Sequence, residues 1–80
     1  MAKNEYVSSI TKNGLIIPDR WDADGNITGV ALAGSDETNY PILMDRIGNT
    51  LLALMNEKVI ITGYIIKEDN RDFIKITSFT

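Results

Sequence analysis

The sequence predicts a mostly antiparallel β-domain of five strands with one short helix between the third and fourth strands. Segments rich in β-branched and aromatic residues recur along the chain and are separated by clusters of Gly, Asp, Asn and Ser. Only one stretch has the composition and the broad apolar side of a helix. A parallel α/β layout would need helices alternating with strands, so we expect a mainly antiparallel sheet. The length of 80 residues fits a single domain over residues 1–80, with Met1 to Glu5 as a loose N-terminus.

The first predicted strand lies within Tyr6 to Pro18 and has the turn-prone pair Asn13 and Gly14 in its middle. This pattern fits either a tight Asn-Gly hairpin or one long strand bent at a glycine. We favour the bent strand, because a small five-stranded barrel needs a first strand that curls and pairs with two neighbours. Pro18 is expected to end the segment.

Alternating polar turns and strand patterns follow in the middle of the chain. Pro41 cannot donate to a strand ladder, which places its strand at a sheet edge or at a strand start. The predicted elements are an acidic loop at Asp19 to Asn26, a strand at Ile27 to Ala33, a turn at Gly34 to Asn39 and a short strand at Tyr40 to Met44.

The predicted helix covers Thr50 to Lys58, where Leu, Ala and Met are strong helix formers and Asn49 or Thr50 can serve as the N-cap. The helix is too short to be stable alone and must pack on an apolar surface. The last two strands, Val59 to Ile66 and Phe73 to Phe79, are predicted to form a hairpin with a six-residue connection from Lys67 to Asp72.

The order of these elements resembles the OB-fold superfamily, whose usual layout is a five-stranded Greek-key barrel with a helix between strands three and four. The resemblance is carried by TLLALMNEK running into VIITGYII and then FIKITSF, and it covers about Tyr6 to Phe79. The stretch GLIIPDRWDADGNITGVAL also looks like small uncharacterised prokaryotic proteins of this size. The resemblance implies a binding module, and the fold alone does not specify its ligand.

The composition of the chain excludes several kinds of catalytic and metal-binding site. The chain has no Cys and no His, which excludes Cys/His zinc sites, thiol nucleophiles and imidazole bases. Carboxylate pairs such as Asp22 with Asp24, or Asp69 with Asp72, lie in polar turns without any sign of a pocket, so we expect no catalysis and no cofactor.

Charge and hydropathy bear on partners. The net charge of −3 disfavours binding to a phosphate backbone. No stretch approaches the roughly 20 apolar residues of a membrane span, and the first residues lack the apolar core of a signal peptide, so a cytoplasmic location is expected. A chain whose signal peptide had been removed would give the same sequence.

The predicted function is a non-catalytic binding or interaction module for a protein partner or another ligand, with self-association as one form of it. Single-stranded nucleic acid is the alternative, because OB-folds bind oligonucleotides beside the loops that here correspond to Asp19 to Asn26 and Lys67 to Asp72. Those loops hold six of the eleven acidic residues, against three cations. The candidate ligand-binding residues are the aromatic Trp21, Tyr40 and Tyr64 and the basic Lys58, Lys67, Arg71 and Lys75. The interpretation without a binding role is that Trp21 caps one barrel end, Tyr40 pairs across the sheet and the acidic residues lie in solvated turns.

A second alternative is binding of a cation or an oligosaccharide at the acidic loops. Asp22, Asp24 and Asp69 are the weak cation candidates, although no register of DADGN matches the spacing of a calcium-binding EF-hand loop. No metal site is therefore predicted.

The expected core consists of thirteen apolar residues, with Ile61 on a central strand. They are Leu15, Ile17, Val30, Leu32, Ile42, Leu51, Leu52, Met55, Val59, Ile61, Ile65, Ile74 and Ile76.

Overall fold

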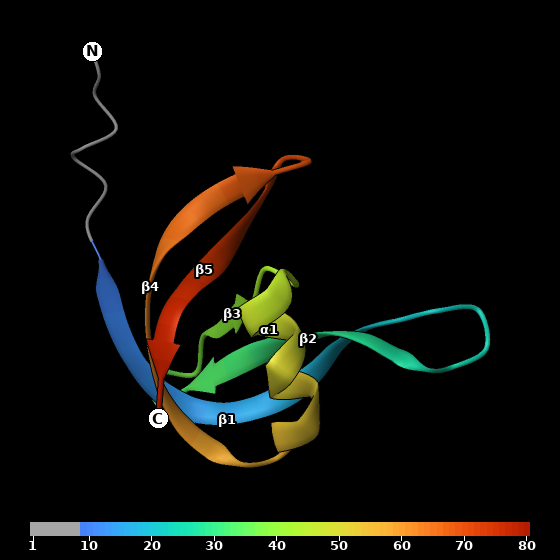
Figure 1. Cartoon of the computed structure of the whole chain (residues 1–80), viewed down its shortest axis with the longest axis horizontal. Helices are drawn as coiled ribbons and strands as arrows, with labels where there is room; N and C mark the ends of the chain where they lie inside the picture. The colour runs from blue at the N-terminus through green and yellow to red at the C-terminus, as the bar shows by residue number, and fades with distance from the viewer. Residues whose placement is uncertain (1–8) are drawn as a thin grey trace.

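The computed structural model describes residues 9–80, which form one five-stranded antiparallel sheet in the order β3-β2-β1-β4-β5 (Figure 1). A short α-helix and a 3-10 turn connect β3 to β4, as the sequence predicts. The elements are β1 (Ile10–Trp21), β2 (Ile27–Gly34), β3 (Asn39–Pro41), α1 (Arg46–Thr50), η2 (Leu51–Leu54), β4 (Lys58–Glu68) and β5 (Arg71–Phe79).

β1 is one long curved strand rather than a hairpin. It pairs with β4 through Ile10 to Leu15 and with β2 from Gly14 to Trp21, so the two neighbours overlap only at the bend. Gly14 is needed there, because a Cβ at this position would overlap the carbonyl oxygen of Ala33 on β2. The predicted bent strand is thus confirmed, while the start of the predicted segment, Tyr6 to Ser8, lies outside the described residues.

The prediction that Pro18 ends this strand is wrong, since β1 continues to Trp21 and the loop is only Asp22 to Asn26. The backbone of Ile16 bonds toward the start of β4, to Asn56 and Glu57. The backbone of Pro18, two residues later, faces the same side. β4 no longer pairs with β1 at this point, so the lack of an N–H in Pro18 removes no hydrogen bond between strands. The register shifts just beyond it, on both sides of Arg20, complete the turn of the strand.

The connection between β4 and β5 is also shorter than predicted. Only Asp69 and Asn70 form the turn, with φ angles of 53° and 64°. Two successive residues with positive φ are typical of the type I′ turn, which matches the twist of the flanking strands, and Asp and Asn tolerate this region. Lys67 and Glu68 therefore pair in register with Asp72 and Arg71 instead of lying in a six-residue loop.

The helix begins before the predicted Thr50 and ends before Lys58. Asp45 is the N-cap in place of Asn49 or Thr50, and its Oδ1 accepts a hydrogen bond from the N–H of Gly48 at 2.9 Å. The Leu-rich stretch continues as η2, and the extended Met55 followed by Asn56, with φ of 66°, turns the chain into β4. The apolar side of this segment still packs on the sheet, with Leu51 in the core and Leu52 and Met55 against it.

The core lies inside the curved sheet and under η2. Nine buried residues form it, namely Ile16, Val30, Leu32, Ile42, Leu51, Val59, Ile61, Ile74 and Ile76. The predictions of Leu15 and Ile17 are wrong, because Ile16 opposes the buried Leu32 and its two neighbours therefore point to the other face. Ile65 was also predicted to be buried and is instead exposed.

The predicted barrel is not closed. Among residues 9–80, β5 meets the segment that follows β3 at a single parallel bridge between Ile42 and Ile74, where the Leu43 N–H donates to the Ile74 carbonyl at 2.9 Å. Before that point along both strands, β3 and β5 are not paired with each other.

Candidate binding surface

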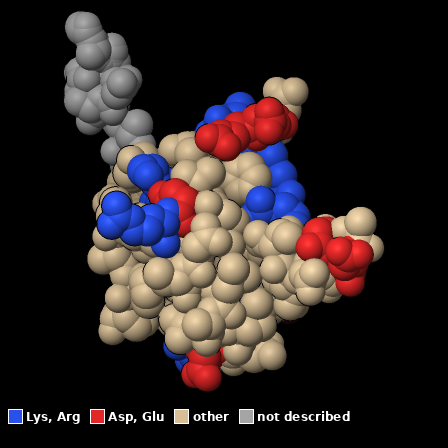
Figure 2. Space-filling model, turned by 45° about the vertical axis from the view of Figure 1, so that its right-hand side comes forward, with Lys and Arg blue, Asp and Glu red and all other residues tan. Residues whose placement is uncertain are grey.

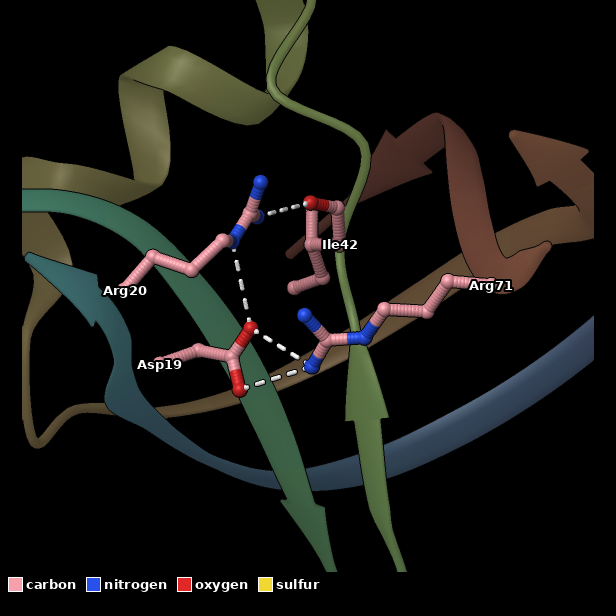
Figure 3. Close-up of polar contacts among 4 residues, drawn as sticks. All are labelled: Asp19, Arg20, Ile42 and Arg71. Carbon is pink, nitrogen blue, oxygen red and sulfur yellow. Dashed lines mark hydrogen bonds and ion pairs between the residues drawn. The ribbon is translucent and has the colours of Figure 1, made fainter. Parts of the chain in front are cut away.

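Two hairpins are linked close to their turns by four residues that we call the arginine cluster: Asp19, Arg20, Arg71 and Phe73. Asp19 Oδ2 accepts from Arg20 Nε at 3.2 Å and from Arg71 Nη2 at 3.1 Å (Figure 3). The Phe73 ring lies between the two guanidinium groups, whose Cζ atoms are 5.1 Å (Arg20) and 5.4 Å (Arg71) from its centroid. The end of β1 is thereby joined to the start of β5.

Arg20 reaches farthest across the sheet. Its Nη2 donates to the carbonyl of Ile42 at 3.0 Å, just beyond β3 (Figure 3). The side chain passes over Gly29 of β2, and a Cβ there would overlap the guanidinium group. Gly29 thus leaves room for Arg20 to cross β2 and reach the point where β3 meets β5.

A cleft of about 420 Å³, which we call the hairpin cleft, opens beside the arginine cluster. Its walls combine cations, an aromatic ring, apolar side chains and two carboxylates: Arg20, Leu43, Met44, Glu68, Asp69, Arg71 and Phe73. Figure 2 shows carboxylates at the tips of both hairpins, with basic groups between them. Within residues 9–80 the cleft therefore combines two cations that are paired with Asp19 and two carboxylates, Glu68 and Asp69, that form no ion pair.

Trp21 lies at the end of β1 on the β1–β2 hairpin, which projects from the rest of the molecule (Figure 1). It pairs in register with Ile27 and is 57% exposed, so it does not cap the end of a barrel. The adjoining turn is held by Asp22, whose Oδ1 accepts from the N–H groups of Asp24 and Asn26 at 2.9 Å each. The bonds from Asn26 lead the causes that lower the pKa of Asp22.

The other predicted aromatic residues are engaged elsewhere. Tyr40 pairs with Leu32 across the sheet, and its hydroxyl donates to Asp36 Oδ2 at 2.7 Å, which lowers the pKa of Asp36. Tyr64 is half-buried on β4 opposite Lys75. Neither residue lines the hairpin cleft.

The predicted basic residues are spread along the last hairpin and are mostly paired. Lys75 Nζ bonds to Asp45 Oδ2 at 2.9 Å, and Lys67 bonds to Asp72 at 3.1 Å. Lys58 lies at the opposite end of β4 from Lys67, about 30 Å along the strand. Only Arg71 lies in the hairpin cleft.

Asp22, Asp24 and Asp69 are not brought together. No group of three or more acidic side chains within residues 9–80 is placed to hold a metal ion. No helix in this part of the chain is long and apolar enough to cross a membrane.

Of the four residues of the arginine cluster, only Arg71 is a candidate from the sequence, and Asp19, Arg20 and Phe73 are not. These residues come together because of the register shifts near Arg20, and no local sequence pattern predicts those shifts. The only local signal is Gly29 in the middle of a strand, a position where a glycine often marks close approach of another group.

Four titratable groups have pKa values shifted by their hydrogen bonds and ion pairs. The pKa values of Asp22, Asp36 and Asp45 are lowered by hydrogen bonds, and the pKa of Lys75 is raised by Asp45. All four shifts move away from neutral pH, whereas a general acid or base works best with a pKa near the operating pH.

Comparison of the chain with models of protein families, with curated proteins and with solved structures gave no match.

Proposed function

We propose that this chain is a non-catalytic binding module with an open OB-like arrangement, and that it binds a protein partner at the hairpin cleft. The OB-like assignment is supported by the strand order, by the helical segment between β3 and β4, and by the parallel contact of β3 with β5. In OB-folds the ligand lies near the loops that join strands one to two and four to five. The hairpin cleft occupies that region.

The exposed Trp21 carries the proposal. A tryptophan on a projecting hairpin leaves a large apolar surface in water, and Trp and Arg are the residues most enriched where a few side chains supply most of the binding energy of a protein interface. Trp21 directly follows Arg20 in β1, and Arg20 and Arg71, which line the cleft, are held in place by Asp19.

Charge favours a protein over a nucleic acid at this surface. Three cations lie near the turns of the two hairpins. Asp19 pairs with Arg20 and Arg71, and Asp72 pairs with Lys67. The acids that remain at the rim, among them Glu68 and Asp69, would repel a phosphate backbone. Single-stranded nucleic acid remains the second candidate, favoured by the Phe73 ring between two guanidinium groups, because bases stack on aromatic rings and on Arg.

The proposed absence of catalysis rests on residue chemistry. The chain has no Cys or His, and hydrogen bonds lower the pKa values of Asp22, Asp36 and Asp45 away from neutrality. The hairpin cleft supplies cation, ring and apolar contacts without a nucleophile activated by a neighbouring base.

The test is selection of displayed peptides on the full chain, followed by affinity measurement with Trp21→Ala. We expect selected peptides to lose about 30-fold in affinity, the equivalent of one strong interface residue. Phe79→Ala is the matched control, because Phe79 is also exposed, at 36%, but lies at the opposite end of β5 from Arg71.

A fluorescent oligonucleotide of about 15 nucleotides, titrated at low salt, tests the second candidate. Binding that weakens steeply with salt and depends on Arg71 would replace the protein proposal with the nucleic-acid one. Peptides that bind equally well to both aromatic variants would refute the role of Trp21, on which the proposal rests.

A further inference from the structure

Two carboxylates of the hairpin cleft, Glu68 and Asp69, lie beside a cation that binds elsewhere. Glu68 ends β4 and stands directly opposite Arg71 on β5. The guanidinium group of Arg71 nevertheless bonds to Asp19 of β1, at 3.1 Å from its Oδ2. Asp69 follows Glu68 in the turn of the hairpin. Within residues 9–80 neither Glu68 nor Asp69 forms an ion pair.

The other cation of this hairpin is also paired. Lys67 stands in register with Asp72, and Lys67 Nζ lies 3.1 Å from Asp72 Oδ1. When Asp19 is counted with the two arginines that it binds, the cleft holds one more carboxylate than cations. Glu68 and Asp69 are both exposed. A cation that enters the cleft can therefore approach these two carboxylates without breaking an ion pair of the described residues.

Apolar side chains line the same cleft as these carboxylates. Leu43 and Met44 are half-buried, and Met44 also packs against the core. The backbone beneath them is fixed, because the Leu43 N–H donates to the Ile74 carbonyl at 2.9 Å. Apolar side chains that are already held in place lose little conformational entropy when a partner covers them. The cleft thus combines an apolar wall with an acidic turn that has no internal counter-charge among residues 9–80.

The β1–β2 hairpin adds negative charge on the other side of the arginine cluster. Its turn carries Asp22 and Asp24, and Figure 2 shows acidic groups at the tips of both hairpins. Trp21 directly precedes this turn and is 57% exposed. The face of an indole ring also attracts a cation. The surroundings of the cleft therefore favour a positively charged partner over a negatively charged one.

We propose that the partner segment bound at the hairpin cleft is basic and apolar. It carries a Lys or Arg that faces Glu68 and Asp69, and an apolar side chain that packs on Leu43 and Met44. This inference rests on the proposed function and specifies the chemistry of its partner. Charges at the rim of an interface act mainly on the association rate and its salt dependence, whereas most other interface contacts act on dissociation. Kinetics can therefore separate the acidic turn from Trp21.

The test selects displayed random peptides on the full chain in about 0.1 M salt and measures the binding kinetics of synthesised binders. We expect the selected peptides to be enriched in Lys or Arg next to an apolar residue. The double variant Glu68→Gln, Asp69→Asn should lower their affinity about fivefold, mostly through the association rate, because exposed ion pairs are individually weak. This difference should shrink in about 1 M salt.

Both substitutions are chosen to keep the hairpin folded. Asn tolerates a positive φ as Asp does, and φ of Asp69 is 53°. Glu57→Gln is the matched control, because Glu57 is also exposed but directly precedes β4, at the opposite end of that strand from Glu68. The two positions are roughly 30 Å apart along the strand, whereas charges in about 0.1 M salt act over roughly 10 Å. Glu57→Gln should therefore leave the association rate and its salt dependence unchanged.

Trp21→Ala separates this inference from the proposed function. Peptides rich in Lys or Arg that lose affinity both in Trp21→Ala and in the double variant support the inference. Peptides that depend on Trp21 but are not enriched in Lys or Arg, or that bind the double variant as tightly as the parent, overturn it and leave the proposed function standing. Enrichment in Asp or Glu, with loss of binding in Arg71→Ala, also overturns it. If no peptide is selected, or none depends on Trp21, the proposed function fails and this inference fails with it.

Discussion

Ile61 lies at the centre of β4, where it pairs with β1 on one side and β5 on the other, and it is 1% exposed. Its side chain belongs to the buried cluster that both halves of the sheet share. Any polar atom placed there would lack a partner, because the core contains no buried polar or charged residue among those described.

Ile61→Asp is expected to unfold the domain. A buried unpaired carboxylate is among the most destabilising changes, costing more than about 4 kcal/mol against a total stability of about 5–15 kcal/mol. Circular dichroism during heating checks this, with Ile60→Asp as the exposed control that should retain a cooperative transition. A cooperative transition of Ile61→Asp close to that of the parent would mean that the register of β4 is wrong.

Burial was predicted correctly from the sequence where one large apolar residue has neighbours of a different kind. Val30 and Leu32 are predicted to be buried and are buried, and each is flanked by small residues from which it stands out. In the run Leu15-Ile16-Ile17 every residue is apolar, so the sequence holds no signal for which one faces the core. The pairing of β1 with β2 decides it.

At the scale of the element, the short helix α1 depends on its cap and on one ion pair. Asp45 accepts from the N–H of Gly48 and bonds to Lys75 of β5. The first of these lowers the pKa of Asp45 most, with a further decrease from Lys75. A five-residue helix has little stability of its own, so both contacts matter for its position.

Asp45→Ala should destabilise the domain by about 1 kcal/mol through loss of the N-cap. Because the folded pKa lies below the ordinary value of 3.8, the contribution of the charged carboxylate is present above that value and is lost as pH falls through the lowered pKa. Urea unfolding of the parent and of Asp45→Asn, compared between pH 7 and pH 2, checks this: the difference in stability should shrink below pH 3.8. A constant difference across that range would contradict the assigned ion pair.

The elements themselves were largely predictable, and their ends were not. All five strands and the helical segment were identified from β-branched runs and one Leu-rich stretch. The β4–β5 hairpin extends to Glu68 and Arg71 because pairing across the sheet outweighs the polar character of these residues. Asp45 was overlooked as a cap because the Leu-rich stretch starts five residues later, and Gly48 within the helix hides its true start.

At the scale of the whole molecule, Arg20 links segments that are far apart in the chain. It comes from β1, crosses β2 at Gly29, bonds to Ile42 beyond β3 and packs on Phe73 of β5. The side chain of Arg71, which is more exposed than that of Arg20, pairs with Asp19 and contacts the same ring. The two arginines should therefore contribute unequally to stability.

Arg20→Ala is expected to cost about 1.5–3 kcal/mol in the free energy of unfolding, because the charged donor to a backbone carbonyl and the packing of its long side chain are lost together. Arg71→Ala should cost less than about 1 kcal/mol, as exposed ion pairs do. Urea unfolding measures both, with Arg46→Ala as an exposed control expected to change stability by less than about 0.5 kcal/mol. Equal losses of stability for Arg20→Ala and Arg71→Ala would refute this linking role of Arg20.

The sequence by itself determined the class of this protein: one small antiparallel β-domain, a single helical connection, and a residue set without Cys or His. These follow from local composition, which sets strand and turn preferences within a few residues. Only the tertiary structure decided that the sheet stays open between β3 and β5, that Ile65 is exposed, and that Asp19, Arg20, Arg71 and Phe73 meet. Each of these depends on how strands far apart in the chain pair and bend, and a shift of one residue there changes which side chains face one another.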